Sequence, residues 1–330
     1  MIDPPLLAAN PLLHSTPLFR AGGLTKTFAG GTTALQDLTV VAPRGSIGLV
    51  GANGAGKTTL FRLMLGLIRP TAGWLEVAGR PVAQDPVGVR AHVGFMPEHD
   101  CLPPDQAAAD LVSGFGELSG LPPRAARQRA SDMLDLVGLD EARFRPVGGF
   151  STGMKQRTKL AQALVADPEL VLLDEPTAGF DPTGRDEMLE LVDRLAGFGI
   201  SVILATHLLD DVQRVCDHVV MIDAGRLVLA GATNELLERT GTVRVEVGGA
   251  ERPAARLVDE LTGRGLVALP VDDHTVDVTA DGHPSEIVLD AVRDSVADLE
   301  LRLYSLSTRH RSLDDVFLKR AVGRQGTPSQ

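Results

Sequence analysis

The chain has 330 residues, 44% of them hydrophobic, and its formal net charge at pH 7 is −11. This length favours two domains over one. No apolar run approaches the roughly eighteen residues of a membrane helix, so a role at a membrane would need a separate membrane-spanning partner. The acidic charge argues against nucleic acid as a partner, because a nucleic-acid footprint requires a basic face.

Residues 1–17 hold several prolines and no basic start before an apolar run. We therefore expect a flexible extension and no secretory signal. Cys101 and Cys216 lack the spacing of a metal site, and so few cysteines favour a reducing compartment. We expect neither cysteine to act in function.

Strand-like sequence fills the region from Leu18 to Ala42, where paired glycines mark turns. We expect an antiparallel edge here, and a hairpin from Trp74 to Pro81 that returns to it. Between these segments lies a glycine-rich loop, preceded by the apolar run Ile47 to Val50 and followed by apolar residues at helical spacing. The loop reads Gly51-Ala52-Asn53-Gly54-Ala55-Gly56-Lys57-Thr58-Thr59.

This loop fits the pattern G, four residues, then G-K-[ST], in the strand-to-helix context that makes a chance match improbable. Consecutive backbone N–H groups in such a loop curl round phosphate, and the helix adds its positive end. A nucleoside triphosphate is the ligand that fits. Lys57 is expected to reach the β- and γ-phosphates, and the Thr58 hydroxyl to take one position on Mg²⁺.

Further along, helices and strands alternate, which predicts a mostly parallel sheet with its ligand at the strands' carboxyl ends. Three helices with few β-branched residues predict a helical subdomain at about residues 100–166. The expected helices are Asp105–Leu118, Pro123–Val137, Thr152–Val165 and Gly184–Ala196, and the expected strands are Val93–Met96, Leu170–Leu173, Ser201–Ala205 and Val219–Ile222.

The apolar strand Leu170 to Leu173 leads directly into Asp174 and Glu175. Asp174 would hold Mg²⁺, and Glu175 would act as general base on the attacking water. Alone, this pair could equally be a charged strand end. It is preceded, however, by a serine and glycine at a helix start, Ser151 and Gly153, which form a second candidate anion site.

Beyond residue 240 the pattern of strands and helices changes to β-α-β-β-α-β over residues 241–310. This order is that of the ferredoxin-like α+β fold. We expect Ser312 to Ala321 to form a final helix within a tail, 311–330. The expected catalytic domain then spans residues 18–240.

Taken in order, the motifs resemble those of the ATP-binding subunits of ATP-binding-cassette transporters, over about residues 18–240. The resemblance implies an α/β P-loop NTPase cassette, with ATP and Mg²⁺ as ligands. Gly51 to Thr58 matches the Walker A loop, Ser151 to Gln156 the signature, Leu170 to Asp174 the Walker B strand with Glu175 after it, Ala178 to Asp181 the D-loop, and His207 the switch histidine.

The resemblance also implies that two copies pair head to tail, so that each ATP lies between the Walker A loop of one and the signature of the other. Ser151 and Gly153 would then bind the partner's γ-phosphate, and His207 would hydrogen-bond the γ-phosphate. Phe28 matches the aromatic position that stacks on adenine, although a core aromatic is the alternative. Asp181 closes the D-loop.

Three residues depart from the commonest family pattern. Thr152 and Met154 replace a glycine and a glutamine of the signature, and Glu98 stands where the family usually has a glutamine. A carboxylate can bind Mg²⁺ or water but cannot donate a hydrogen bond. These variants, with the segment Ser312 to Leu318, resemble the branch of bacterial drug, antibiotic and polyketide exporters.

The resemblance therefore implies an ATPase that powers export through a separate polytopic permease, bound peripherally at the cytoplasmic side of the membrane. The alternative is a soluble cassette ATPase acting on chromosomes or ribosomes. Chromosome members need a long coiled-coil insert, whereas 94 residues separate Lys57 from Ser151 (151 − 57). Ribosome members usually carry two cassettes, and an importer subunit is disfavoured by the signature variant and the tail.

Overall fold

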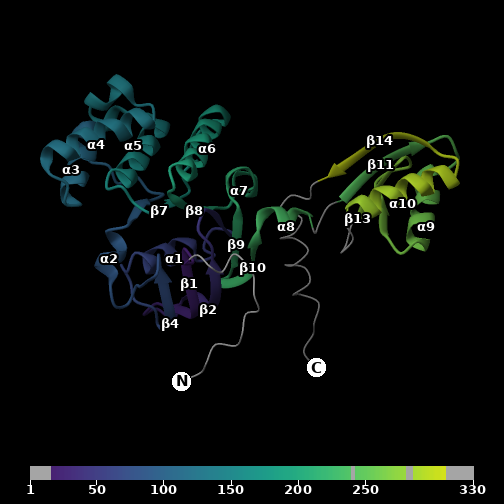
Figure 1. The fold of residues 1–330 in the computed structure, drawn as a ribbon, viewed down its shortest axis with the longest axis horizontal. Coiled ribbons are helices and arrows are strands. Elements are labelled where there is room, and N and C mark those ends of the chain that lie inside the picture. Colours follow the sequence, from purple (N-terminus) through teal and green to yellow (C-terminus); the bar gives the residue numbers. More distant parts are fainter. Residues whose placement is uncertain (1–15, 239–241, 280–284, 310–330) are drawn as a thin grey trace. The chain divides into compact units, whose positions relative to one another are not determined.

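The computed structural model describes residues 16–238, 242–279 and 285–309 (Figure 1). The first fifteen residues of the expected extension and the expected helix Ser312 to Ala321 lie outside the described residues. Contacts divide the chain into two compact units, Met1–Gly231 and Ala232–Gln330. In the described parts of both units, no helix combines the length and apolar character needed to span a membrane.

The first unit contains a six-stranded sheet in the order β10-β9-β3-β8-β7-β6. Its neighbours from β9 to β6 pair in parallel, as the alternating pattern predicted. Every residue of β3, β7 and β8 is buried, which explains why these strands are nearly continuous apolar runs. The strands are β3 (Ser46–Val50), β6 (Val93–Met96), β7 (Leu170–Asp174), β8 (Ser201–Thr206), β9 (His218–Asp223) and β10 (Arg226–Ala232).

The antiparallel strands form a second sheet of their own, in the order β2-β1-β4-β5, rather than an edge of the first. Its strands are β1 (Phe19–Thr27), β2 (Thr33–Ala42), β4 (Ala72–Val77) and β5 (Arg80–Pro81). Leu24 and Leu35 of this sheet, Phe61 of helix α1 (Lys57–Met64) and Leu49 of β3 belong to one hydrophobic core. Both sheets therefore support the helix that follows the glycine-rich loop.

Three helices form the helical subdomain, and Figure 1 shows them grouped apart from the antiparallel sheet. They are α3 (Ala108–Leu118), α4 (Pro123–Leu136) and α5 (Thr152–Leu164), of which α5 also contacts β6. Two short 3₁₀ turns, Asp140–Phe144 and Val147–Gly149, lead into α5. The remaining helices of this unit are α2 (Pro86–Arg90), α6 (Pro182–Gly197) and α7 (Leu209–Val215).

The second unit begins with α8 (Thr233–Glu238) and then follows the expected β-α-β-β-α-β order. Its antiparallel sheet has the order β12-β13-β11-β14. Strand residues such as Val245 and Val276 and helix residues such as Leu257 and Val292 form a core separate from that of the first unit. The elements are β11 (Thr242–Gly248), α9 (Pro253–Gly263), β12 (Val267–Pro270), β13 (Thr275–Thr279), α10 (Ser285–Asp298) and β14 (Arg302–Arg309).

Candidate functional site

The glycine-rich loop joins the carboxyl end of β3 to the first turn of α1. Gly54 and Gly56 adopt positive φ angles of 82° and 111°, a conformation that glycine takes without strain. A Cβ on Gly51 would lie 2.3 Å from the carbonyl oxygen of Ile222, and one on Gly56 would lie 2.6 Å from that of Ala34. The loop therefore needs glycine both for its curvature and for its close approach to neighbouring backbone.

A cleft of about 340 Å³ opens over this loop. It brings together most of the residues that the sequence predicts for phosphate and metal binding, and adds Ala34 and Ala52. Ala55, a residue of the loop itself, is buried. The lining comprises Ala34, Ala52, Asn53, Gly54, Gly56, Lys57, Thr58, Thr59, Glu98, Asp174 and Glu175.

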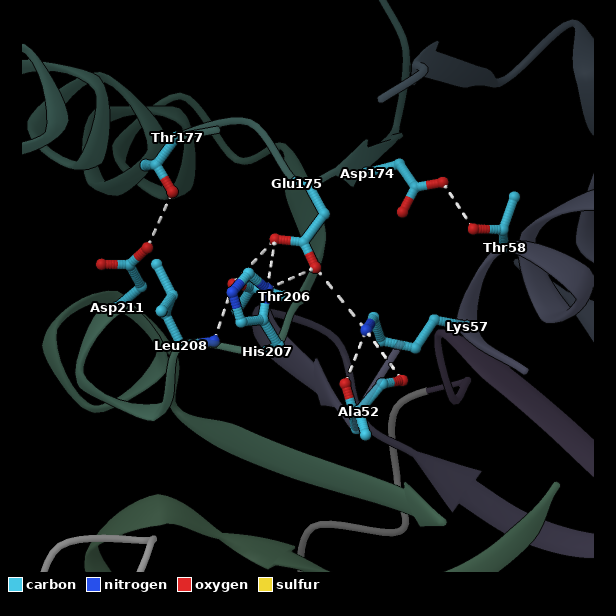
Figure 2. A network of polar contacts seen from close by, with 11 residues as sticks. Ala52, Lys57, Thr58, Asp174, Glu175, Thr177, Thr206, His207, Leu208 and Asp211 are labelled. Carbon is cyan, nitrogen blue, oxygen red and sulfur yellow. Dashed lines mark hydrogen bonds and ion pairs between the residues drawn. The ribbon is translucent and has the colours of Figure 1, made fainter. Parts of the chain in front are cut away.

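Lys57 is a buried cation at the floor of this cleft. Its Nζ donates to the carbonyl oxygens of Gly51, at 2.6 Å, and Ala52, at 3.4 Å. Its ammonium also forms an ion pair with Oε1 of Glu175 at 3.5 Å. Figure 2 draws this contact between the two side chains. Because burying an unpaired charge is costly, this carboxylate and the two carbonyls are what make a buried ammonium tolerable here. The ammonium thus lies between the phosphate loop and the carboxylate at the end of β7.

Asp174 and Thr58 form a pair suited to a hard cation. The Thr58 hydroxyl donates to Oδ2 of Asp174 at 3.0 Å, whereas Oδ1 of Asp174 is buried without a hydrogen-bond partner. Burial raises the pKa of Asp174, nearby Glu98 and Glu175 raise it further, and the Thr58 hydrogen bond and Lys57 oppose the rise. A divalent cation would satisfy the unpaired oxygen and offset the clustered negative charge. Hydroxyl and carboxylate oxygens are ligands that Mg²⁺ accepts, so these residues fit that ion.

Glu175 lies at the centre of a polar network (Figure 2). Its Oε2 accepts a hydrogen bond from the Thr206 hydroxyl at 3.3 Å, and Nδ1 of His207 lies 3.0 Å from its Oε1. The side chain is buried, and the backbone has a φ of 49°, which is unusual for a residue with a Cβ. Strained backbone of this kind concentrates at functional sites. Carboxylate, lysine and histidine are thus held around one point.

Thr206 is a site residue that sequence reasoning missed. It is fully buried at the end of β8, and its hydroxyl both donates to Glu175 and accepts from the backbone N–H of Leu208. Its place directly before His207, at the carboxyl end of a buried strand beside β7, is the sequence signal that could have identified it.

Asp211 was also missed. It is 1% exposed, accepts from the Thr177 hydroxyl at 2.9 Å, and accepts from Nε of Arg185 at 2.6 Å. It therefore ties the segment after Glu175 to α7, which follows His207 (Figure 2). An acidic residue in the first turn of a short helix, next to the second acid Asp210, gives no sequence signal of this burial.

Seven predicted site residues are absent from the lining of the cleft: the loop residues Gly51 and Ala55, together with Phe28, Ser151, Gly153, Asp181 and His207. Ser151 caps α5 by accepting from the Met154 N–H at 3.2 Å, and Asp181 caps α6 by accepting from the Gly184 N–H at 2.8 Å. A Cβ on Gly153 would lie 2.9 Å from the Phe180 ring. Phe28 follows β1, is 38% exposed, and has Lys26 Nζ 5.2 Å from its ring centroid, so it is not a core aromatic.

Comparison of the sequence with known proteins points to the same family as the motifs do. Residues 35–178 match the sequence profile described as ABC transporter. The chain is 34% identical over 88% of its length to the daunorubicin resistance ATP-binding protein DrrA3 of Streptomyces coeruleorubidus, covering 91% of that protein. It is 36% identical over 75% of its length to the Nod factor export ATP-binding protein I of Ralstonia nicotianae, covering 77% of it.

A solved structure gives the same result for the fold. Structural comparison with cbiO1 from Clostridium perfringens, described as part of the ABC transporter complex cbiONQ, gives a TM-score of 0.62 at 29% sequence identity. The match covers 67% of this chain and 91% of that one.

Proposed function

The chain belongs to the ABC transporter family as an ATP-binding subunit of the exporter type, an ATPase, and from this premise we propose that it powers export of a substrate across the cytoplasmic membrane through a separate permease. The observation that carries the catalytic part is that Lys57 and His207 both contact the Glu175 carboxylate beside the glycine-rich loop.

In this proposal the loop N–H groups and Lys57 bind the phosphates of ATP. Glu175 accepts the proton of the attacking water, with Thr206 and His207 fixing the direction of its carboxylate. Thr58 and Asp174 would hold Mg²⁺, which would neutralise charge on the phosphates. Burial is the main cause of the raised pKa of Asp174, and the charges of Glu98 and Glu175 add to it, so a bound cation would offset charge that has gathered at this point.

A second copy of the chain is the proposed partner at this site. Ser151 and Gly153 lie at the start of α5 and do not line the cleft around Lys57. A head-to-tail pair would bring the Ser151 region of one copy to the phosphates bound by the other, and the exposed Phe28 could then stack on adenine. His207 and Glu98 would complete the surroundings of the γ-phosphate.

Export, and not action on ribosomes or chromosomes, is favoured by the relatives, which are named for drug resistance and for Nod factor export. The chain covers nearly the full length of the first of them, so the similarity includes the second unit as well as the cassette. We therefore place the protein peripherally at the cytoplasmic side of the membrane, bound to a polytopic permease.

Fractionation of cells of the source organism tests this placement. A tagged chain is expected to sediment with membranes, to be released at alkaline pH as peripheral proteins are, and to bring down a polytopic membrane protein after gentle detergent extraction. The tagged Lys57→Ala variant is fractionated in parallel, and the comparison shows whether membrane association depends on bound nucleotide. Co-sedimentation with ribosomal particles in a sucrose gradient, and none with membranes, would overturn the proposal.

A further inference from the structure

The loop that carries Glu98 begins where β6 ends. In the parallel pairing of β6 with β7, Met96 lies opposite Leu173, so the residues after Met96 emerge beside Asp174 and Glu175. Glu98 lines the same cleft as those two carboxylates. Its negative charge also contributes to the raised pKa of Asp174. The position of this loop therefore determines how close a third carboxylate comes to the Thr58 and Asp174 pair.

A buried lysine of α5 holds the backbone of this loop. Nζ of Lys159 donates to three successive carbonyl oxygens, those of Pro97 at 2.7 Å, Glu98 at 2.9 Å and His99 at 3.4 Å. An ammonium has three N–H donors, so this arrangement uses all of them. Lys159 is only 3% exposed. A buried ammonium normally has a carboxylate in direct contact, whereas the Lys159 ammonium donates its hydrogen bonds to backbone carbonyls.

A second contact joins the same two segments at the surface. Nζ of Lys155, one turn earlier on α5, lies 2.7 Å from Oδ2 of Asp100. Residues four apart lie on the same face of a helix, so one face of α5 contacts the loop at two points. The N-cap of α5 is Ser151. The helix thus has the signature serine at its start and the Glu98 loop attached to its flank.

We propose that Lys159 is a positioning residue for ATP hydrolysis, which couples the placement of Glu98 at the cleft to the placement of the helix that begins at Ser151. This inference rests on the proposed assignment of the cleft as the Mg²⁺ and ATP site. A shift of α5 on meeting nucleotide bound by a partner copy would move the backbone of Glu98 with it. The loop and the helix then respond to nucleotide as one body.

Two simpler functions of Lys159 predict different results. If Lys159 only stabilises the loop, its loss would lower stability without depending on Glu98. If it only supplies positive charge to Glu98 and Asp174, any neutral replacement would act alike. Burial lowers the pKa of Lys159, and Glu98, Asp100 and Asp174 oppose that change, so a charge effect has to be tested directly.

The test compares Lys159→Met, which keeps the shape but removes every donor, with Lys159→Gln, which keeps two donors without the charge. Arg127→Met is the control, because it removes an exposed cation from α4 of the same helical subdomain. Each variant is made in the native chain and in a Glu98→Ala background. Measurements are binding of a fluorescent ATP analogue in EDTA, the Mg²⁺ dependence of steady-state ATP turnover, and hydrogen exchange of a peptide covering residues 97–101.

For Lys159→Met we expect ATP binding in EDTA to stay within about twofold, while kcat falls by ~10–100-fold, because small misplacements of site groups cost that much. The Mg²⁺ needed for half-maximal turnover should rise and the peptide should exchange faster. Lys159→Gln should recover part of both losses, and Arg127→Met should stay within about twofold. In the Glu98→Ala background, Lys159→Met should add less than about twofold.

Several results would overturn the inference. One is a native kcat and Mg²⁺ dependence in a folded Lys159→Met protein. Another is an undiminished effect of Lys159→Met in the Glu98→Ala background, and a third is equal loss in the Met and Gln variants. If Lys159→Met does not fold, Lys159→Gln and the Glu98→Ala pair give the same test. Absence of ATP binding by the native chain would instead overturn the proposed function.

Discussion

The carboxylate of Glu175 is surrounded by groups of different chemistry. Its two carboxylate oxygens contact a lysine, a histidine and a hydroxyl, and its own backbone N–H donates to the carbonyl of Ala205 at 2.9 Å. Such a carboxylate can take up a proton while its direction stays fixed. The same contacts hold its side chain in place if its charge is removed, which makes a clean test of its function available.

Glu175→Gln preserves size and most hydrogen bonding but removes the proton acceptor. We expect hydrolysis to fall by roughly 10²–10⁴, or about 3–5 kcal/mol of barrier, with ATP binding retained. The variant should accumulate as an ATP-bound dimer on size-exclusion chromatography with ATP and Mg²⁺ in the presence of the membrane partner. Glu117→Gln, at an exposed position of α3, is the control. Near-native turnover by Glu175→Gln would exclude the carboxylate as general base.

At the scale of elements, helix α5 and strand β6 are tightly packed against each other. A Cβ on Gly94 of β6 would lie 2.0 Å from the carbonyl oxygen of Ala163 near the end of α5. Backbone therefore packs directly on backbone at this point, and only glycine fits. The contact fixes the depth of the helix that carries Ser151 and Lys159.

Gly94→Ala should destabilise the first unit, because the added methyl must push α5 away from β6. Overpacking of this kind costs about 1–3 kcal/mol, measurable as a lower midpoint in urea denaturation. Gly114→Ala in α3 is the matched control: its Cβ meets nothing within 4 Å, and alanine in a helix is favoured by about 0.5–1 kcal/mol. Equal midpoints for native chain and Gly94→Ala would show that α5 can shift freely.

The sequence predicted the elements whose signal is local. Buried strands such as Leu170–Asp174 have continuous apolar runs, and the glycine-rich loop has its own pattern. Helices α2 and α7 were not predicted, because segments of five and seven residues are too short to show helical periodicity. Lys159 could not have been placed, because a lysine in a helix is usually solvated, and its burial comes from a loop sixty residues earlier along the chain.

At the scale of the whole molecule, the two units have separate hydrophobic cores. Each of the cleft-lining residues belongs to the first unit. The second unit has its own closed set of strand pairings within the described residues. Nucleotide binding should therefore be independent of the second unit, whose contribution would lie in pairing of the copies or docking of a partner.

Deletion of residues 241–330 tests that independence. The truncated chain should bind ATP within about twofold of the full chain, while dimer stability or transport changes. Calorimetry should lose one unfolding transition and keep the other, since units with separate cores can unfold separately. The full-length chain measured in the same buffer is the reference. A folded truncation that no longer binds ATP would contradict this view of the second unit.

The left-handed backbone at Glu175 sets stability and activity against each other at a single position. A residue with a Cβ loses about 1 kcal/mol in that conformation, whereas glycine loses almost nothing and asparagine little. Removing this glutamate would relieve the strain but would leave the buried Lys57 ammonium without its carboxylate, so a heat-resistant replacement must keep an oxygen beside that ammonium, and it would still lack turnover. Variants of this chain selected for thermostability must be screened for ATP hydrolysis in the same round.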